Sequence, residues 1–432
     1  MSQAKQTWDR DGIALYLGDC LDILPQLPPD RFEAIVTDPP YGLEFMGKQW
    51  DRLWRRAGKE TIRSYGRTAP MFKADTPRYQ AGAEAQEWHR TWAVAALAAL
   101  APRGRLLAFG GTRVHHRLWC AIEDAGFDIT DTLMWLHGQG FPKGKSCLKP
   151  AWEPIALARK GKAAPLNIDK CRIHVSPEDG GGFRSGDYSH RNDSRSSYDF
   201  MENGQPYRKD QHPSGRWPAN LCLSHHPECR QVGTKRVATG TAVGENASPG
   251  RVYGGGKGLV SQGKGTNVEG YADAEGKETV EAWECHPECP VRILDQQSGE
   301  RSDPHRVEVV KKSIWGGSQM QFTGVRGFGD TGGASRFFYC PKASRAERGE
   351  GNGHPTVKPL ALIRWLVELV TPSGGTVLDP FLGSGTTAVA SVETGRPFVG
   401  IEIDPHYFEI AVKRIERALA EKAELLPFKE PE

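Results

Sequence analysis

The segment Asp38-Pro39-Pro40-Tyr41 carries the first groups that could do chemistry: a carboxylate, a backbone carbonyl and an aromatic ring. Each proline fixes its own φ and restricts the residue before it to extended geometry, so these groups are held rigidly. In an open parallel sheet, ligands bind in the crevice beyond the carboxyl ends of the strands, where this turn would lie. A strand that merely ends in a proline turn would have the same sequence, so this segment alone does not decide its role.

The segment from Thr376 to Thr387 is the second candidate. A short apolar strand ends there in Asp379-Pro380 and turns through glycines into a helix. Gly383 and Gly385 would let the backbone approach a ligand closely at the helix N-terminus. No Gly-Lys-Ser/Thr follows, which excludes a phosphate-binding P-loop.

The same glycines also fit a dinucleotide-binding fingerprint, Gly383-x-Gly385-x-x-Ala388, with Glu402 at about the expected distance. A carboxylate at Glu402 could bind the two hydroxyls of a ribose in a nicotinamide enzyme or in an adenosylmethionine enzyme. The dinucleotide interpretation leaves residues 38–41 without a role. The two segments together therefore favour a different class of enzyme.

Together the two segments resemble the amino-methyltransferases of DNA, which use S-adenosylmethionine (SAM) to methylate exocyclic amines of adenine or cytosine. Residues 38–41 match the catalytic tetrapeptide of that family, and residues 379–385 match its cofactor loop. The catalytic segment precedes the cofactor loop, as in the permuted β arrangement of the family. The resemblance covers roughly residues 12–157 and 353–419.

The resemblance implies a set of site residues. The catalytic residues would be Asp38, Pro39, Pro40 and Tyr41. The cofactor-binding residues would be Asp19, Lys358, Asp379, Pro380, Phe381, Gly383, Ser384, Gly385, Thr386 and Glu402. For Asp19 two roles stay open: a cap of the following helix, and a neighbour of the adenine of the cofactor.

The implied chemistry starts from an amine that is a poor nucleophile, because its lone pair is delocalised into the ring. Asp38 would accept one amine hydrogen and the carbonyl of Pro39 the other, which frees the lone pair for the methyl group. Tyr41 would stack on a base flipped out of double-stranded DNA. Asp at position 38 favours adenine N6 by resemblance alone, so cytosine N4 stays open.

Three other functions were weighed. A nucleic-acid-binding protein with an inert methyltransferase core would not need Asp38 and Tyr41 intact. An RNA target is a weaker possibility. Methylation at a cytosine carbon requires a nucleophilic cysteine that follows proline in related enzymes, and the chain contains no Pro-Cys pair.

The elements that must position these residues form an α/β fold, expected to be a circularly permuted Rossmann-like methyltransferase sheet. The expected strands are 13–17, 32–37, 105–109, 129–136, 153–158, 335–340, 376–379 and 398–401, and the expected helices are 21–27, 84–101, 114–125, 360–370, 384–393 and 407–420. The strand at Val377 should lie beside and parallel to the strand at Ile35, because only then do Asp38 and Gly383 meet at one crevice.

The middle of the chain differs in composition. Residues 138–355 hold 33 of the 50 glycines and 31 Lys and Arg against 25 Asp and Glu. We expect a loop-rich target-recognition domain at 161–340, between a catalytic half at 1–160 and a cofactor-binding half at 341–432. Aromatic side chains at two places could stack on bases: Phe45, Trp50 and Trp54 in one loop, and Tyr188, Tyr198, Tyr207 and Tyr253 among arginines. Trp217 is expected to anchor a small core.

A short repeat in this span predicts a metal site. The sequence His-Pro-Glu-Cys occurs at 226–229 and at 286–289. The two copies supply ligand pairs at matching spacing, and a structural Zn²⁺ would stabilise a module with few apolar residues. The proposed ligands are His225, Cys229, Cys285 and Cys289, with His226 and His286 as alternative ligands.

The nine cysteines and a polar start indicate a reducing, intracellular setting of bacterial or phage type. We expect no signal peptide and no transmembrane segment, because the chain has no apolar run of membrane length. The expected partner is double-stranded DNA, with a restriction endonuclease as a further partner in the cell.

Overall fold

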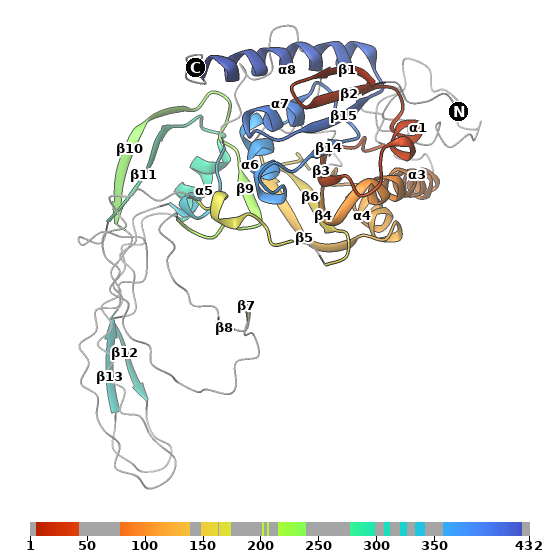
Figure 1. The fold of residues 1–432 in the computed structure, drawn as a ribbon. Helices are drawn as coiled ribbons and strands as arrows, with labels where there is room; N and C mark the ends of the chain where they lie inside the picture. The colour runs from red at the N-terminus through yellow and green to blue at the C-terminus, as the bar shows by residue number, and fades with distance from the viewer. Residues whose placement is uncertain are drawn as a thin grey trace, which may run out of the picture.

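The computed structural model describes residues 6–42, 78–138, 148–162, 164–173, 215–238, 277–298, 333–341 and 357–425, and short strands at 201–202, 205–206, 306–311 and 320–325. Its centre is a nine-stranded mixed sheet with helices on both faces (Figure 1). Among the described residues, no helix has the length and hydropathy needed to cross a membrane.

Five neighbouring strands of this sheet are parallel, and antiparallel pairs extend it on both sides. In spatial order the strands are β1 (Gln6–Arg10), β2 (Ile13–Leu17), β15 (Phe398–Glu402), β14 (Val377–Asp379), β3 (Phe32–Thr37), β4 (Leu100–Phe109), β6 (Trp152–Arg159), β5 (Asp128–Leu136) and β9 (Leu221–Leu223). Helices on both faces bury the parallel strands, which explains why β3 is almost continuously apolar.

Two hydrophobic cores lie on opposite faces of the sheet. One face is covered by α6 (Leu360–Val370), α7 (Thr386–Glu393) and α8 (Pro405–Leu425), and the other by α1 (Cys20–Ile23), α3 (Arg78–Ala99) and α4 (His115–Asp124). In α3, Trp88, Trp92 and Ala96 share one buried face, as expected from their helical spacing. The sheet therefore separates the molecule into two layers of helices (Figure 1).

The predicted pairing of the two motif strands is confirmed. Val377 pairs with Ala34 and Leu378 with Ile35, in parallel, although more than 300 residues separate them in the chain. β2 is parallel to β3 in the same sheet, as expected, but β15 and β14 lie between them. The first and last parts of the described chain therefore interleave in one sheet.

Several expected elements differ in the structure. Residues 335–340 were expected to form a strand; instead they follow a 3₁₀ turn, η6 (Ala334–Phe337), and make one bridge from Tyr339 to Cys222. The helix expected at 21–27 divides into α1 and a 3₁₀ turn, η1 (Leu24–Gln26), which has a proline at its start. The expected strands 129–136 and 153–158 pair with each other as β5 and β6, and the short strand β9, which was not expected, lies outside β5.

The span expected as a recognition domain contacts the sheet closely. Besides β9, it contains η4 (Ile168–Lys170), a ribbon of β10 (Arg230–Ala238) and β11 (Lys277–Glu284), and α5 (Pro290–Ser298). Two further strand pairs are β7 (Met201–Glu202) with β8 (Gln205–Pro206), and β12 (Arg306–Lys311) with β13 (Met320–Val325). The Asn167 amide donates to carbonyls of Glu368 and Thr371, so this segment packs against α6.

Trp217 does not anchor a core. Its side chain is 48% exposed and its ring lies beside the guanidinium of Arg172, 5.4 Å from the ring centroid. The expectation was wrong because a tryptophan ring need not be buried in a core: at the surface, the planar guanidinium of an arginine can cover one face of the ring. The other aromatic residues expected to stack on bases, at positions 45, 50, 54, 188, 198, 207 and 253, lie outside the described residues.

Candidate active site

The predicted site residues follow the carboxyl ends of four neighbouring parallel strands. Asp19 follows β2, Glu402 ends β15, Asp379 ends β14 and Asp38 follows β3. Since parallel strands end at the same edge of a sheet, the four carboxyl groups lie along one edge. The structure therefore brings the catalytic and cofactor segments to a single edge.

A buried hydrogen bond joins the two segments directly. The hydroxyl of Thr37 donates to Oδ1 of Asp379 over 2.6 Å, and the same oxygen accepts the amide of Phe381 at 3.0 Å. Burial raises the pKa of Asp379 to about 6, against the hydrogen bonds that lower it. The end of β3 and the start of the glycine loop are thus held in fixed register.

Asp38 lies in a compact network of charged groups. Its Oδ2 is 2.5 Å from Nζ of Lys358, and its Oδ1 accepts the hydroxyl of Tyr41 at 2.9 Å. Oε2 of Glu153 is 3.2 Å from both Lys358 Nζ and the Tyr41 hydroxyl. Two carboxylates therefore share one ammonium group and one phenol.

The pKa shifts in this network keep Lys358 charged and Tyr41 neutral. Burial lowers the pKa of Lys358, but the carboxylates of Asp38 and Glu153 raise it further, and the net pKa lies above its usual value. Burial and the same carboxylates raise the pKa of Tyr41. Burial also raises the pKa of Asp38, while Lys358 opposes that shift. Lys358 thus provides the charge that favours an ionised Asp38 in a buried position.

Lys358 was expected in the cofactor pocket; the structure shows its ammonium group bound to Oδ2 of Asp38. Nζ also lies 5.0 Å from the ring centroid of Phe109 and 5.8 Å from that of Tyr41. Lys358 directly precedes Pro359, which is the N-cap residue of α6. Lys358 therefore contacts the carboxylate of Asp38 directly, beside the rings of Phe109 and Tyr41.

The glycine loop is shaped by its own backbone and by α8. Gly385 is the N-cap of α7 with φ +83°, and a Cβ there would lie 2.9 Å from Cβ of Ala411. The need for glycine at 385 thus comes from the packing of α7 against α8 as well as from the left-handed backbone. Gly383, with φ +54°, donates its amide to Oε2 of Glu402 at 2.7 Å.

Glu402 is buried and bound to backbone amides on both sides. Its Oε1 accepts the amide of Asp404 at 2.8 Å, and burial raises its pKa to about 7. Each carboxylate oxygen retains a second lone pair that can accept a ribose hydroxyl. A carboxylate beside a glycine turn fits the ribose of an adenosine cofactor.

The remaining predicted residues have clear local partners. Asp19 caps α1, since its Oδ1 accepts the amide of Leu21 at 3.0 Å. Pro380 belongs to the turn after β14, and the ring of Phe381 lies 5.7 Å from Trp88 and 5.4 Å from Trp92 of α3. This packing ties the loop to the helix layer on one face of the sheet.

Four residues of the site were missed by the sequence analysis: Thr37, His137, Glu153 and Arg414. Arg414 of α8 donates to the carbonyl of Ser384 at 2.5 Å and to the hydroxyls of Ser384 and Thr386 at 3.1 Å. Nε2 of His137 lies 3.8 Å from Glu153. A glutamate near the start of an otherwise apolar strand was the one signal that could have identified Glu153.

The predicted metal ligands also converge. His225, Cys229, Cys285 and Cys289 come from two separate segments, and their ligand atoms all lie within 4.8 Å of one another.

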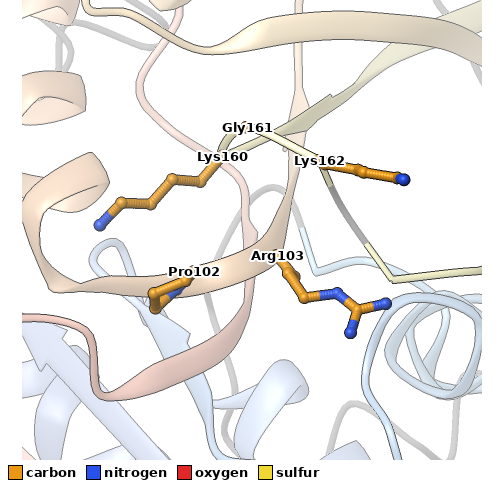
Figure 2. A pocket seen from close by; sticks show the side chains of 5 residues that line it. All are labelled: Pro102, Arg103, Lys160, Gly161 and Lys162. Carbon is orange, nitrogen blue, oxygen red and sulfur yellow. The ribbon is translucent and has the colours of Figure 1, made fainter.

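A hollow of about 560 Å³ lies elsewhere, at the opposite edge of the sheet. Pro102, Arg103 and residues 160–162 line it, where β4 begins and β6 ends (Figure 2). Lys160 there binds Asp30 at 2.6 Å. This hollow lies at the other ends of the strands from Asp38 and takes no part in the site.

A family model described as DNA methylase, of the N6/N4 methyltransferase type, matches residues 32–413. The type II methyltransferase M.ScaI of Streptomyces caespitosus is 47% identical over 75 residues, which cover 17% of this chain and 24% of that protein. The DNA adenine methyltransferase YhdJ of Escherichia coli (strain K12) is 40% identical over 77 residues, 18% of this chain and 26% of that protein. The chain thus spans about a quarter of the length of these relatives.

The solved structures that align with this chain include the cytosine-N4-specific PvuII DNA methyltransferase. It aligns over 96% of this chain and 93% of its own length, at 13% identity and a TM-score of 0.44. The complex of M1.HpyAVI with SAM aligns over 93% of this chain and 98% of its own length, at 16% identity and a TM-score of 0.35.

Proposed function

The chain belongs to the DNA methylase family of N6-adenine and N4-cytosine methyltransferases, and from this premise we propose that it methylates the N6 amine of adenine in double-stranded DNA. The observation that carries the proposal is the junction of two strand ends. Thr37, beside Asp38, donates a 2.6 Å hydrogen bond to Asp379 at the start of the glycine loop. An amine bound at Asp38 would therefore lie next to a cofactor bound at the loop.

The cofactor in this proposal is SAM, which when bound supplies an electrophilic methyl group on a sulfonium. Glu402 would accept hydrogen bonds from the ribose hydroxyls, and the backbone of residues 379–385 would contact the rest of the molecule. Asp19 would border the adenine. Arg414 fixes the loop by its hydrogen bonds to Ser384 and Thr386.

Asp38 would accept a hydrogen bond from one N–H of the target amine, and the carbonyl of Pro39 would accept a hydrogen bond from the other. Both carboxylate oxygens of Asp38 already have donors, Tyr41 and Lys358. The amine would replace the hydroxyl of Tyr41, which frees the ring to stack on the flipped base. Lys358 would remain, keeping Asp38 ionised as positive charge develops on the amine nitrogen.

Cytosine N4 is the second candidate, because the same two acceptors fit its amine. Relatives of both kinds are found: YhdJ is named an adenine methyltransferase, and the PvuII enzyme is cytosine-N4-specific. Asp at position 38 is the reason to place adenine first.

The residues between 161 and 340 are proposed to recognise the target sequence in DNA. The wider span of residues 138–355 holds 31 Lys and Arg against 25 Asp and Glu, and this excess favours contact with a polyanion. M.ScaI is named a type II methyltransferase, and we extend the proposal to a modification enzyme of intracellular, bacterial or phage type with a companion restriction endonuclease.

The test is transfer of a tritium-labelled methyl group from SAM to DNA, followed by nucleoside analysis. The expected product is N6-methyladenine; N4-methylcytosine would replace the first candidate with the second, and no transfer to any DNA would refute both.

Asp38→Ala should lower the transfer rate by about 10²-fold to 10³-fold or more, because the amine loses an ionised acceptor. The affinity for SAM, measured by calorimetry, should change little. Asp22→Ala, at an exposed position on α1, is the control and should match the wild type. Near-normal transfer by the Asp38 variant would remove the basis of the mechanism.

A further inference from the structure

Two copies of His-Pro-Glu-Cys form equivalent turns at the ends of different strands. In each copy the amide of the cysteine donates to the carbonyl of the histidine of the motif, at 2.9 Å from Cys229 to His226 and at 3.0 Å from Cys289 to His286. In each copy the glutamate amide donates to Nδ1 of that histidine, at 3.3 Å for His226 and 3.2 Å for His286. The two turns are thus copies of one local structure.

The three histidines near these turns differ in what their rings contact. His226 and His286 use Nδ1 to accept a backbone amide, and their rings stack on each other with centroids 4.0 Å apart. His225 is 2% exposed, and its Nδ1 lies 3.6 Å from Sγ of both Cys285 and Cys289. Among the described residues, the group of ligand atoms around the three cysteines thus contains His225 and neither His226 nor His286.

The distances fit one tetrahedral zinc ion. Zn–S bonds of about 2.3 Å and Zn–N bonds of about 2.0 Å at a tetrahedral angle place nitrogen and sulfur about 3.5 Å apart. The two nitrogen–sulfur distances of 3.6 Å match this value, and Cys229 completes the group within 4.8 Å. A disulfide would use only two of the three sulfurs and would leave the histidine without a role.

The surroundings supply the outer contacts that a zinc–thiolate site needs. The amide of His286 donates to Sγ of Cys229 at 3.4 Å, and Arg292 donates to the carbonyl of Cys285 at 3.1 Å. The ring of Trp283 stacks on that of His225, with centroids 4.0 Å apart, which fixes the orientation of the ligand. Such outer contacts hold the ligands in place and tune the metal.

We propose that His225, Cys229, Cys285 and Cys289 bind one structural Zn²⁺. Four protein ligands leave no open position for a substrate or a water, so the ion would not be catalytic. It would join the turn between β9 and β10 to the turn between β11 and α5. Among the described residues, the hydrophobic cluster there has four buried members, Leu223, Cys229, Cys289 and Val291, and seven partly buried ones, and the ion would add direct bonds between the two turns.

The proposed ion would also fix the ribbon beside the active site. A Cβ on Gly138 would lie 2.9 Å from the carbonyl of Glu288 and 3.1 Å from Pro290, so the second turn packs on the end of β5. The preceding residue, His137, lies 3.8 Å from Glu153 of the catalytic network. Loss of the metal should therefore loosen the recognition span next to the site.

The first test is metal analysis of the purified full-length protein by mass spectrometry. The expected content is about one equivalent of zinc. Replacement by Co²⁺ should give the absorption bands of a tetrahedral site with sulfur-to-metal charge transfer. Less than about half an equivalent of zinc in protein that binds DNA would overturn the proposal.

Matched variants distinguish ligands from neighbours. Cys229→Ser and His225→Ala should lose the metal, whereas Cys120→Ser, at an exposed free cysteine, and His226→Ala should retain it. Equal loss of metal in the His225 and His226 variants would contradict the assignment.

A second test uses the wild-type protein and therefore does not depend on whether a variant folds. Modification of its thiols should release about one zinc per chain, and a chelator should raise the number of reactive thiols by three. SAM affinity should survive chelation, so the result does not depend on the proposed activity.

Discussion

Asp38, Glu153 and Lys358 set the charge of the active site at the scale of single residues. Two buried carboxylates share one ammonium group, with contacts of 2.5 Å and 3.2 Å. The group carries a net negative charge when all three are ionised, which suits a cationic cofactor and a developing positive charge on an amine. Lys358 is consequently a positioning residue that acts through Asp38.

Lys358→Met should change the pH dependence of methyl transfer. Without the ammonium, burial and Glu153 raise the pKa of Asp38 further, because both disfavour its ionised form. Less Asp38 is then ionised at a given pH, so the acid limb of the rate profile should move up by about one unit or more.

A pH–rate profile under single-turnover conditions measures this shift. Lys160→Met is the matched control, since Lys160 also binds a carboxylate, that of Asp30, but at the opposite edge of the sheet. A profile that only falls in height, with its acid limb unmoved, would show that Lys358 does not act on Asp38.

Glu402 predicts a second pH effect, on cofactor binding. Burial raises its pKa from 4.5 to about 7 in the folded protein. Folding then favours the protonated form, so this group contributes stability to the free protein at low pH, and that contribution is lost as the pH rises through 7. The affinity for SAM should depend on pH in the opposite direction. The cationic cofactor and its two ribose hydroxyls bind the ionised form of Glu402 better than the protonated form.

The expected result is a Kd for SAM about tenfold weaker at pH 6 than at pH 8, as follows from one ionisation near pH 7. Calorimetry at the two pH values measures it. Glu402→Gln should abolish the difference, and Glu409→Gln, on the exposed side of α8, should preserve it. A difference that persists in the Glu402 variant would assign the effect to another group.

At the scale of elements, the β10–β11 ribbon connects the segment 239–276 to the turns of the proposed metal site. Ala238 pairs with Lys277 at one end of the ribbon, and Arg230 pairs with Glu284 at the other. The first end opens to residues 239–276, and the second end leads into the proposed metal site. Because Ala238 and Lys277 already face each other, a two-residue turn can join them.

Replacement of residues 239–276 by Asn-Gly should therefore leave the fold, the zinc content and the SAM affinity unchanged. Binding of specific DNA, measured by gel shift, should weaken if this segment recognises the target, as we propose. A large drop in Tm or in SAM affinity would show that the segment supports the core instead. Replacement of 239–276 by a glycine-serine linker of equal length controls for chain length.

At the scale of the whole molecule, the sequence predicts what depends on local pattern and misses what depends on distant partners. Apolar runs at Phe32–Thr37 and Phe398–Glu402 identify buried strands. The two sequence motifs, at residues 38–41 and 379–385, identify the edge of the sheet at which the parallel strands end. The pairing of Lys358 with Asp38 joins residues 320 positions apart, and no local pattern encodes it. The strand β9 has three residues, too few for any periodicity to appear.

The interleaving of the first and last strands has a consequence for synthesis of the protein on the ribosome. β2 pairs with β1 and β15, and β3 pairs with β4 and β14, so a nascent chain that ends before residue 377 has a sheet with two strands missing. The inner edges of β2 and β3 then stay unpaired until translation is almost complete, and contacts this distant in sequence form slowly. Asp38, which follows β3, and the glycine loop, which follows β14, are therefore expected to come together only in this late step.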